Sequence, residues 1–369
     1  MSDPRIQALT MPKWGMAMDE GTVTAWHIAE GAPVNAGDEV LDVESTKIAN
    51  AIEAKAPGVL RRQVAEIGQI LPVGALLGIV ALPDVSDEEI VAYIGEFKFV
   101  TPDGDDPDAG PRAQTIEVDG QPIRYVVQGE SGRPVLMIHG FGGDLGAWMF
   151  NQPSLADRYR VIACDLPGHG GSTKNVGDGS VQHLARVVLG LSEALELRHV
   201  HLVGHSLGGV IAMAMALEQP ERIASLTLIA PAGLGPDING DYIRGFVAAS
   251  RARDMKEWAK RLFADGNLVT RRMVEDILRM KRIDGCNAAL EKIAVAQFDG
   301  NRQKTDFSAR AAALPMQVQI IWGAEDRIIP ASQARALSGP RVVILEGAGH
   351  MAMMERAGEV NQLIASFID

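Results

Sequence analysis

The second half of the chain alternates short apolar runs with longer segments of helical periodicity. From residue 115 onward, each run has four or five mostly apolar residues and no Asp, Glu, Lys or Arg. Runs of this length suit strands, and strands buried on both faces of a parallel sheet show this pattern. The pattern predicts an α/β fold over residues 115–369, with strands at residues 135–138, 161–164, 199–203, 226–229, 318–322 and 342–345.

A long segment, residues 232–312, separates the fourth run from the fifth. Its bulky apolar residues fall at helical spacing, which predicts a helical cap with apolar inner faces. Most of these side chains should pack the cap, and some should line a pocket beneath it. They are Tyr242, Phe246, Met255, Trp258, Leu262 and Phe263.

The front of the chain follows a different pattern and contains an internal repeat. Residues 21–43 and 58–80 align at an offset of 37, with glycines and apolar residues at matching places. Within each copy, short alternating runs are broken by Gly and Pro, which indicates strands and turns. Two copies predict a small all-β unit with approximate two-fold symmetry. The matching pairs include Gly21 with Gly58, Gly31 with Gly68, Gly37 with Gly74, and Val40 with Leu77.

Lys47 lies between the two copies, in the sequence Glu-Ser-Thr-Lys-Ile-Ala-Asn at 44–50. A connection between the last strand of one copy and the first of the next would be a hairpin tip. Such a tip presents its lysine to solvent. A solvated surface lysine is the simpler interpretation, but the placement of Lys47 at the hinge of the repeat favours a special role.

These residues resemble the lipoyl domains of 2-oxo acid dehydrogenase complexes. The resemblance covers residues 4–82 and rests on residues 30–38, 43–48 and 73–74 with Gly58 and Gly68. It implies a β-sandwich or flattened barrel over residues 1–83 and lipoate in amide linkage on Lys47. A biotin carrier is the alternative, but such carriers usually have Met on both sides of the lysine, where this chain has Thr46 and Ile48.

Residues 84–114 are expected to link the two halves. Ser86 and Glu89 have capping-box spacing, and apolar residues from Ile90 to Phe97 follow it, so a short amphipathic helix should begin there. Residues 101–111 hold three prolines and four aspartates and cannot bury apolar area. We expect this stretch to be a flexible tether that lets Lys47 visit several active sites.

Composition narrows the class of protein. Among 369 residues, 35 are Lys or Arg and 47 are Asp or Glu, a formal net charge of −12, which disfavours a nucleic-acid partner. No apolar run approaches the roughly 20 residues of a membrane span, and no secretory signal is visible. With only Cys164 and Cys286, the chain lacks a disulfide framework, so we expect a cytoplasmic protein.

Residues 204–209, Gly-His-Ser-Leu-Gly-Gly, stand between a predicted strand and the apolar helix at 210–217. The G-x-S-x-G pattern in this context predicts a nucleophile elbow, in which small neighbours let a tight turn expose the hydroxyl of Ser206. The earlier strand ends in His-Gly-Phe-Gly-Gly at 139–143. Its backbone can turn toward a developing oxyanion, so the N–H groups of Phe141 and Leu207 are the expected oxyanion hole.

A serine nucleophile needs an acid and a histidine later in the chain. Asp326 follows the strand at 318–322, and His350 follows the next strand, which gives the order serine, acid, histidine. His350 should take the proton of Ser206 while Asp326 holds its imidazole, with Glu325 as the alternative acid. His205 should point away from the nucleophile, and no metal site is expected.

Two further polar patterns have simpler explanations. His139 and Asp144 match an H-x-x-x-x-D acyltransferase signature, which we attribute to chance because the glycine loop explains the segment better. His169, in a loop rich in glycine, should have a structural role.

The second half resembles the α/β-hydrolase superfamily over residues 115–369. Members with this pattern include C–C bond hydrolases, esterases, haloperoxidases and epoxide hydrolases. Ser206 excludes the epoxide hydrolases, which would need Asp at this position.

A lipoyl domain followed by an α/β-hydrolase domain resembles the acyltransferase component of acetoin dehydrogenase complexes. The resemblance implies transfer of acetyl from the lipoyl arm to coenzyme A through a Ser-His-Asp acyl-enzyme. It implies three partners: a thiamine-dependent acetoin dehydrogenase component, dihydrolipoamide dehydrogenase and a lipoate ligase.

The chain departs from ordinary 2-oxo acid acyltransferases, because it has neither their H-x-x-x-D-G motif nor a basic subunit-binding module. Two other functions therefore stay open. One is a hydrolase of an ester or C–C bond with the lipoyl domain as a tether, and the other is a lipoyl carrier with a scaffold domain.

Overall fold

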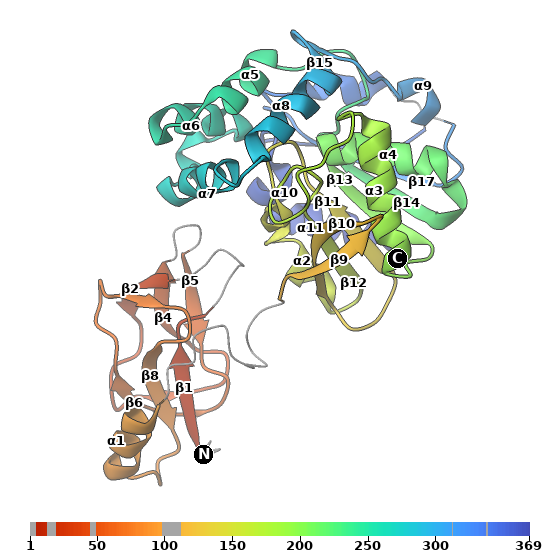
Figure 1. The fold of residues 1–369 in the computed structure, drawn as a ribbon. Coiled ribbons are helices and arrows are strands. Elements are labelled where there is room, and N and C mark those ends of the chain that lie inside the picture. The colour runs from red at the N-terminus through yellow and green to blue at the C-terminus, as the bar shows by residue number, and fades with distance from the viewer. Residues whose placement is uncertain (1–4, 13–19, 45–48, 98–111, 312, 337–338) are drawn as a thin grey trace. The chain divides into compact units, whose positions relative to one another are not determined.

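The structure is a computed structural model that describes residues 5–12, 20–44, 49–97, 112–311, 313–336 and 339–369. The chain divides into two compact units, Met1–Gly110 and Pro111–Asp369, here called unit 1 and unit 2. Figure 1 labels their helices and strands. No helix in the described residues is long and apolar enough to cross a membrane.

Unit 1 is built from eight described strands and one helix. The strands are β1 (Ile6–Thr10), β2 (Glu20–Trp26), β3 (Pro33–Val34), β4 (Glu39–Glu44), β5 (Ala49–Glu53), β6 (Gly58–Gln63), β7 (Ile70–Pro72) and β8 (Leu76–Ala81). They form two antiparallel four-stranded sheets, with the orders β1-β8-β6-β3 and β5-β4-β2-β7. The two sheets share one core, to which Leu9 and Leu60 contribute from the first sheet and Val23 and Leu41 from the second. The predicted β-sandwich is confirmed.

The internal repeat is visible in the backbone. β4 and β8 begin and end 37 residues apart, and so do the first residues of β3 and β7. The paired glycines also match, since Gly31 and Gly68 have φ of +84° and +87°, while Gly37 and Gly74 both have +88°. Left-handed backbone favours glycine because it has no Cβ. The four glycines therefore fix equivalent turns in the two copies.

Lys47 lies outside the described residues, which stop at Glu44 and resume at Ala49. β4 and β5 are antiparallel neighbours, and Glu44 lies opposite Ala49 in their register. The segment that contains Lys47 therefore connects two adjacent strands of one sheet.

The helix expected after the small unit forms as α1 (Asp87–Glu96). Ser86 caps it, and the reciprocal bond from Glu89 completes the predicted capping box. The helix packs on the strands of unit 1, where Ile90 is fully buried beside Ile79. Arg61 donates to the carbonyl of Val85 and to the carboxylate of Asp87, the first residue of the helix. The expected tether, residues 101–111, lies outside the described residues.

Unit 2 contains an eight-stranded sheet. Its strands are β9 (Gln114–Val118), β10 (Gln121–Gln128), β11 (Pro134–Ile138), β12 (Arg160–Cys164), β13 (Val200–His205), β14 (Ile223–Ile229), β17 (Gln317–Gly323) and β18 (Arg341–Leu345). The order is β18-β17-β14-β13-β11-β12-β10-β9, parallel from β18 to β12 and antiparallel at the two remaining pairings. All six predicted strands are present, and five of the runs are buried as expected for a sheet covered on both faces. The sixth run, in the edge strand β18, is half-buried except at Leu345.

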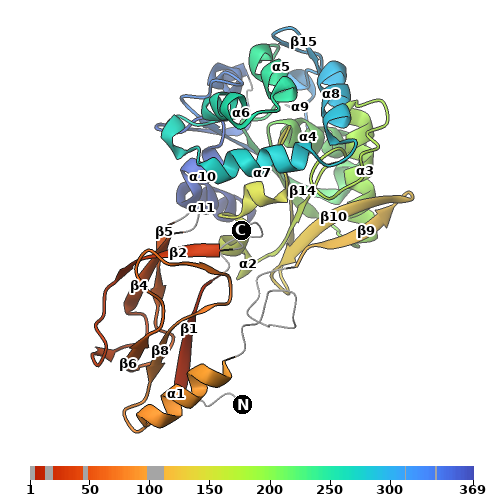
Figure 2. The same ribbon diagram turned by 60° about the vertical axis from the view of Figure 1, so that its left-hand side comes forward.

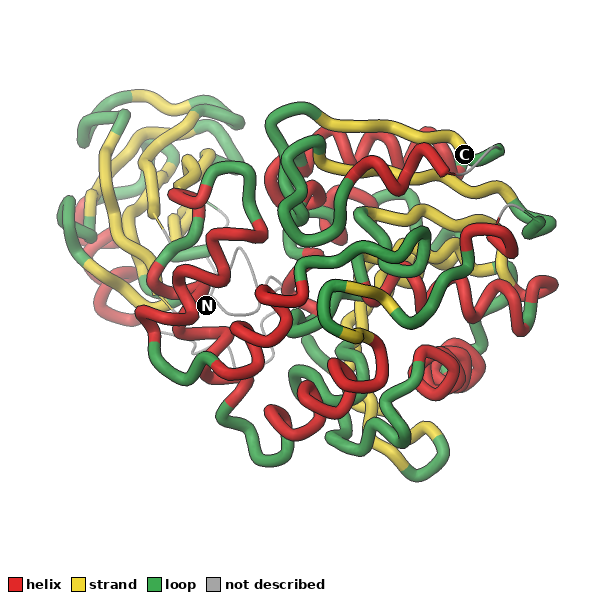
Figure 3. The backbone as a smooth tube through the Cα atoms, turned by 90° about the horizontal axis from the view of Figure 1, so that it is seen from above, coloured by secondary structure: helices red, strands yellow, loops and turns green. Residues whose placement is uncertain are grey.

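Helices pack on the sheet in two groups. Figure 1 labels them, and Figure 3 colours the helices red and the strands yellow. α3 and α4 pack on each other, and α4 lies on β11, β13 and β14; the second group joins α2 to α11 and α11 to α10. Their bounds are α2 (Gln152–Ala156), α3 (Val181–Ala194), α4 (Leu207–Glu218), α10 (Ala352–Glu355) and α11 (Ala357–Ile368). The core on the α4 side takes alternate strand residues such as Leu136 and Ile138, while Val135 and Met137 are buried on the other face.

The predicted helical cap lies between β14 and β17. Figure 2 shows its main helices together on one side of the sheet. The cap elements are α5 (Gly240–Ala248), α6 (Ala252–Ala259), η3 (Lys260–Leu262), η4 (Gly266–Leu268), α7 (Arg271–Lys281), α8 (Cys286–Gln297), β15 (Phe298–Asp299), β16 (Arg302–Gln303) and α9 (Ser308–Ala311). Lys281 of α7 donates to the carbonyls of Phe246, Val247 and Ala249, so it caps the carboxyl end of α5. Three remaining 3₁₀ turns complete unit 2: η1 (Leu145–Trp148), η2 (Pro220–Arg222) and η5 (Ala331–Ala336).

Candidate active site

Residues 204–208 form the tight strand-to-helix turn that their sequence predicts. β13 ends at His205, α4 begins at Leu207, and Ser206 between them has φ +53° and ψ −115°. Such a backbone conformation costs a residue with a side chain on the order of 1–3 kcal/mol, so the surrounding packing must impose it. A turn of this kind presents a serine hydroxyl at the carboxyl edge of the sheet.

The glycines around Ser206 are required by close backbone packing. A Cβ on Gly204 would lie 2.5 Å from the carbonyl oxygen of Gly208, and one on Gly208 would lie 2.1 Å from that of Ile138. The same closeness brings the loop after β11 to the elbow, because a Cβ on Gly140 would lie 3.0 Å from the Cβ of Ser206. The predicted nucleophile and the predicted oxyanion loop therefore meet.

His350 and Asp326 form a hydrogen-bonded pair. The His350 Nδ1 atom lies 2.8 Å from Asp326 Oδ2, and the two side chains are only 3% and 0% exposed. An imidazole that uses Nδ1 for a buried carboxylate has Nε2 left for proton exchange. The pair therefore has the arrangement that a general base and its orienting acid need.

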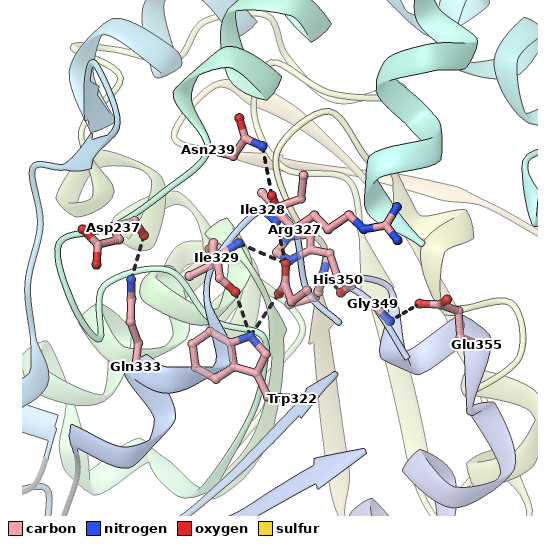
Figure 4. Close-up of polar contacts among 12 residues, drawn as sticks. Asp237, Asn239, Trp322, Arg327, Ile328, Ile329, Gln333, Gly349, His350 and Glu355 are labelled. Carbon is pink, nitrogen blue, oxygen red and sulfur yellow. Dashed lines mark hydrogen bonds and ion pairs between the residues drawn. The ribbon is translucent and has the colours of Figure 1, made fainter. Parts of the chain in front are cut away.

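Three further donors hold the carboxylate of Asp326, and Figure 4 labels the residues that supply them, Trp322, Ile328 and Ile329. Its Oδ1 atom accepts from the backbone N–H groups of Ile328 at 2.8 Å and Ile329 at 3.0 Å. Its Oδ2 atom accepts from the indole N–H of Trp322 at 3.0 Å, besides the bond with His350. These donors fix the direction in which the carboxylate meets the imidazole. The sequence reasoning missed the role of Trp322, although this residue stands four positions before Asp326.

Glu325, the alternative acid, faces a different group. Its two oxygens accept from the backbone N–H of Gly347 at 3.2 Å and of Ala348 at 3.0 Å. The carboxylate thus anchors the loop that leads to His350, whereas the imidazole itself bonds to Asp326. This placement favours Asp326 as the acid.

The two expected oxyanion donors have no partner within the part of the chain that the structure describes. Leu207 is the first residue of α4, where a backbone N–H has no acceptor inside the helix. The N–H of Phe141 likewise donates no hydrogen bond, whereas that of the next residue, Gly142, donates to His169 Nε2 at 3.1 Å. Both N–H groups are therefore available to a ligand.

His139 and His169 hold the oxyanion loop through hydrogen bonds to its backbone at Gly140 and Gly142. His139 Nε2 accepts from the N–H of Leu166 at 3.0 Å, and the two imidazoles lie edge to face with centroids 5.0 Å apart. Burial lowers the pKa of His139 and brings the pKa of His169 to about 3, so both rings are neutral supports. Asp144 caps η1 through a 2.8 Å bond from Gly146 N–H. The H-x-x-x-x-D match thus corresponds to two local structural roles.

His205 lies against the base. Its Nε2 atom is 2.9 Å from the carbonyl oxygen of His350, and the two rings have centroids 4.7 Å apart. Burial holds the pKa of His205 well below its ordinary value, so the neutral ring donates its N–H to that carbonyl. The residue before the proposed nucleophile therefore contacts the backbone of the proposed base, a link that the sequence reasoning did not find.

Acid should destabilise unit 2, because several of its histidines are buried and neutral. Burial lowers the pKa of His201, which bonds Ser225 at 2.7 Å, to about 4, and the pKa of His169 to about 3. Below about pH 6.5 the unfolded chain binds protons at these sites before the folded chain does, so the free energy of unfolding falls on acidification. Each fully buried histidine contributes a slope of roughly 1.4 kcal/mol per pH unit.

Urea unfolding of the intact protein between neutral pH and about pH 4.5 measures this slope. His201→Asn should reduce it. A free energy of unfolding that does not change over this interval would contradict the assignment of neutral buried histidines.

Comparisons with known proteins agree with the two-unit architecture. Residues 133–357 match the family described as alpha/beta hydrolase fold, and residues 7–80 match a biotin/lipoyl family described as Biotin-requiring enzyme. A protein of Pseudomonas putida named dihydrolipoyllysine-residue acetyltransferase component of acetoin cleaving system is 47% identical, over 99% of each chain. A protein of Cupriavidus necator with the same name is 42% identical, over 98% of this chain and 97% of its own.

Unit 2 also resembles solved structures. The crystal structure of a meta-cleavage product hydrolase is 25% identical with a TM-score of 0.63, and the match covers 69% of this chain and 97% of that one. The likeness confirms the predicted fold of the second half.

Proposed function

This chain belongs to the family of dihydrolipoyllysine-residue acetyltransferase components of acetoin cleaving systems, and we propose how its two units share that reaction. The reaction transfers an acetyl group from a lipoyl arm to coenzyme A in acetoin catabolism. One observation carries the proposal: a single chain joins a lipoyl-type unit to a unit that holds an elbow serine and a buried His–Asp pair, with His205 of the elbow in contact with His350. Unit 1 carries the acetyl group, and unit 2 transfers it.

Unit 2 supplies the groups that acyl transfer through a serine requires. The Ser206 hydroxyl attacks the carbonyl carbon of the acetyl thioester, and His350 takes the hydroxyl proton. The N–H groups of Phe141 and Leu207 donate to the oxyanion that forms. His350 then gives the proton to the departing sulfur, which leaves the acetyl group on Ser206.

The second half of the reaction uses the same groups in reverse. His350 takes the proton of the coenzyme A thiol while its sulfur attacks the acetyl-serine ester. The two backbone N–H groups again hold the oxyanion. Its collapse releases acetyl-coenzyme A, and His350 returns the proton to Ser206. A thioester is consumed and a thioester is formed, so no oxidant or metal is needed.

Lipoate supplies the acetyl group as a thioester on a long arm, and we assign its attachment to Lys47. The pairing of Glu44 with Ala49 supports the assignment. The residues between them join the adjacent strands β4 and β5 and lie, in the sequence, between the two repeat copies. Residues 101–111 are the proposed tether of unit 1.

Lys47→Arg should abolish lipoylation and leave unit 2 intact. Protein made in lipoate-fed cells should gain the mass of one lipoyl group, and the variant should gain none. Lys55→Arg, which changes the nearby exposed Lys55, is the matched control and should be modified like the parent. A lipoyl group retained in Lys47→Arg would refute the assignment.

The partners follow from the reaction. A thiamine-dependent component would load the arm, dihydrolipoamide dehydrogenase would reoxidise it, and a lipoate ligase would attach it. The proposed location is the cytoplasm, a reducing compartment that suits the free and buried Cys164 and Cys286.

Supplying the purified chain with acetyl-dihydrolipoamide and coenzyme A tests the proposed function. Acetyl-coenzyme A should accumulate in proportion to protein and to the presence of both substrates. A chain that releases only acetate would instead be a hydrolase tethered to a lipoyl unit, and an inert chain would be a carrier with a scaffold.

A further inference from the structure

Glu355, the last residue of α10, has a half-buried carboxylate that binds backbone groups of two different segments. Its Oε2 atom accepts from the N–H of Gly349, the residue before His350, at 2.7 Å. Its Oε1 atom accepts from the N–H of Ala264, in the cap between η3 and η4, also at 2.7 Å. Figure 4 shows the bond to Gly349 beside His350. Neither oxygen meets a cationic side chain in these bonds.

The cap segment 262–264 lies directly on the loop that carries His350. A Cβ on Gly349 would lie 2.6 Å from the backbone nitrogen of Ala264 and 3.0 Å from the carbonyl oxygen of Leu262. On the other side of His350, the N–H of Met351 donates to the same Leu262 oxygen at 3.1 Å. The residues before and after His350 are therefore both bound to the cap, one of them through Glu355.

The whole approach to His350 is held by carboxylates. Glu325 takes the N–H groups of Gly347 and Ala348, and Glu355 takes the next one, from Gly349. Hydrogen bonds from a backbone N–H to a carboxylate are stronger than those between neutral groups. These bonds restrict the loop, and they hold the imidazole beside Asp326.

We propose that Glu355 is a positioning residue for His350, because its carboxylate bridges the loop of the base to the cap. The inference rests on the proposed function, since it assumes that His350 is the base for Ser206. Burial raises the pKa of the Glu355 carboxyl, and the two backbone donors oppose this effect. The Glu355 carboxylate therefore joins the loop of His350 to the cap in a site whose burial disfavours a negative charge.

Glu355→Gln should reduce turnover more than binding. An amide keeps the shape of the side chain but offers only one acceptor oxygen, while its NH₂ group faces a second donor. Loss of one bond frees Gly349 or Ala264, and a displacement of about 1 Å at a catalytic group can cost on the order of a hundredfold in rate. The first-order rate constant should fall, and the concentration for half-saturation should stay near that of the parent.

Labelling of Ser206 by a small fluorophosphonate tests the inference apart from acetyl transfer. The serine oxygen forms a bond to phosphorus, fluoride leaves, and His350 takes the hydroxyl proton, so the rate reports the base. Intact mass gives the saturating rate constant and the half-saturation concentration separately. The matched control is Glu359→Gln on α11, an exposed carboxylate paired with Arg356. Glu355→Asp, which keeps the charge but is one methylene shorter, is the second variant, and thermal unfolding shows that each variant is folded at the assay temperature.

If Glu355 positions His350, folded Glu355→Gln or Glu355→Asp should label Ser206 with a lower saturating rate constant than the parent. Glu359→Gln should label at the parent's rate. A folded variant that labels at the parent's rate would overturn the role of Glu355 and leave the triad intact. A parent whose Ser206 is not labelled would overturn the triad, and the inference with it. A change confined to half-saturation would mean that Glu355 only shapes the pocket.

Discussion

Ser206→Ala should abolish acetyl transfer while lipoylation of Lys47 continues. The Ser206 oxygen is the nucleophile that carries the acetyl group in the proposed acyl-enzyme. Loss of a nucleophile of this type lowers the rate on the order of a thousandfold or more. The fold should persist, because Ser206→Ala removes one oxygen and adds no atom where the elbow approaches Gly140 closely. Units 1 and 2 have separate cores, so the variant should leave unit 1 unaffected.

Rates of acetyl-coenzyme A formation from acetyl-dihydrolipoamide, with intact mass of the same samples, measure both parts of this prediction. Ser172→Ala, at a buried hydroxyl that bonds the carbonyl of Asp165, is the matched control and should retain turnover. Transfer that persists in Ser206→Ala would exclude the double-displacement mechanism and favour direct attack of the thiol on the thioester.

Asp326→Asn should cost on the order of ten thousandfold in rate, as expected when the histidine of such a triad takes the wrong tautomer. The amide could offer either an N–H or an oxygen to His350 Nδ1. It would therefore no longer select the tautomer of His350 that carries its proton on Nδ1. The backbone N–H groups of Ile328 and Ile329 require an acceptor and would hold the amide oxygen at the Oδ1 position. The NH₂ group would then face the indole N–H of Trp322 and the imidazole of His350. The loss should appear mainly in the turnover number.

Glu325→Gln is the natural comparison, because Glu325 is adjacent in sequence but bonds the loop and not the imidazole. It should cost much less than Asp326→Asn. Steady-state rates and thermal unfolding midpoints of the two variants decide between the acids. A larger loss in Glu325→Gln would assign the orienting role to Glu325.

The fold could be predicted because its signals are local. Apolar runs that are buried on both faces gave the strands of unit 2, and the 37-residue repeat gave the paired turns of unit 1, where Gly37 and Gly74 have the same φ. The elbow was also predictable, since its G-x-S-x-G pattern is continuous in the sequence and Gly204 approaches Gly208 within the turn itself. Each of these signals can be read from neighbouring residues.

The supports of the site could not be predicted, because they depend on contacts between distant segments. The bond from His205 to the backbone of His350 spans 145 positions, and the bond from Ala264 to Glu355 spans 91. Nothing in the sequence around Glu355 marks it as a link to the cap. The order of Ser206, Asp326 and His350 predicted the residues of the triad, but not what holds them.

The central claim is that the acetyl group passes through Ser206 and leaves on coenzyme A. The most direct measurement is a chase: the chain is mixed with acetyl-dihydrolipoamide, the acetylated residue is identified by mass, and coenzyme A or buffer is then added. We expect acetyl on Ser206 that disappears on addition of coenzyme A with formation of an equal amount of acetyl-coenzyme A, and that decays slowly to acetate in buffer. Acetyl-serine that goes to acetate at the same rate with and without coenzyme A would contradict the account.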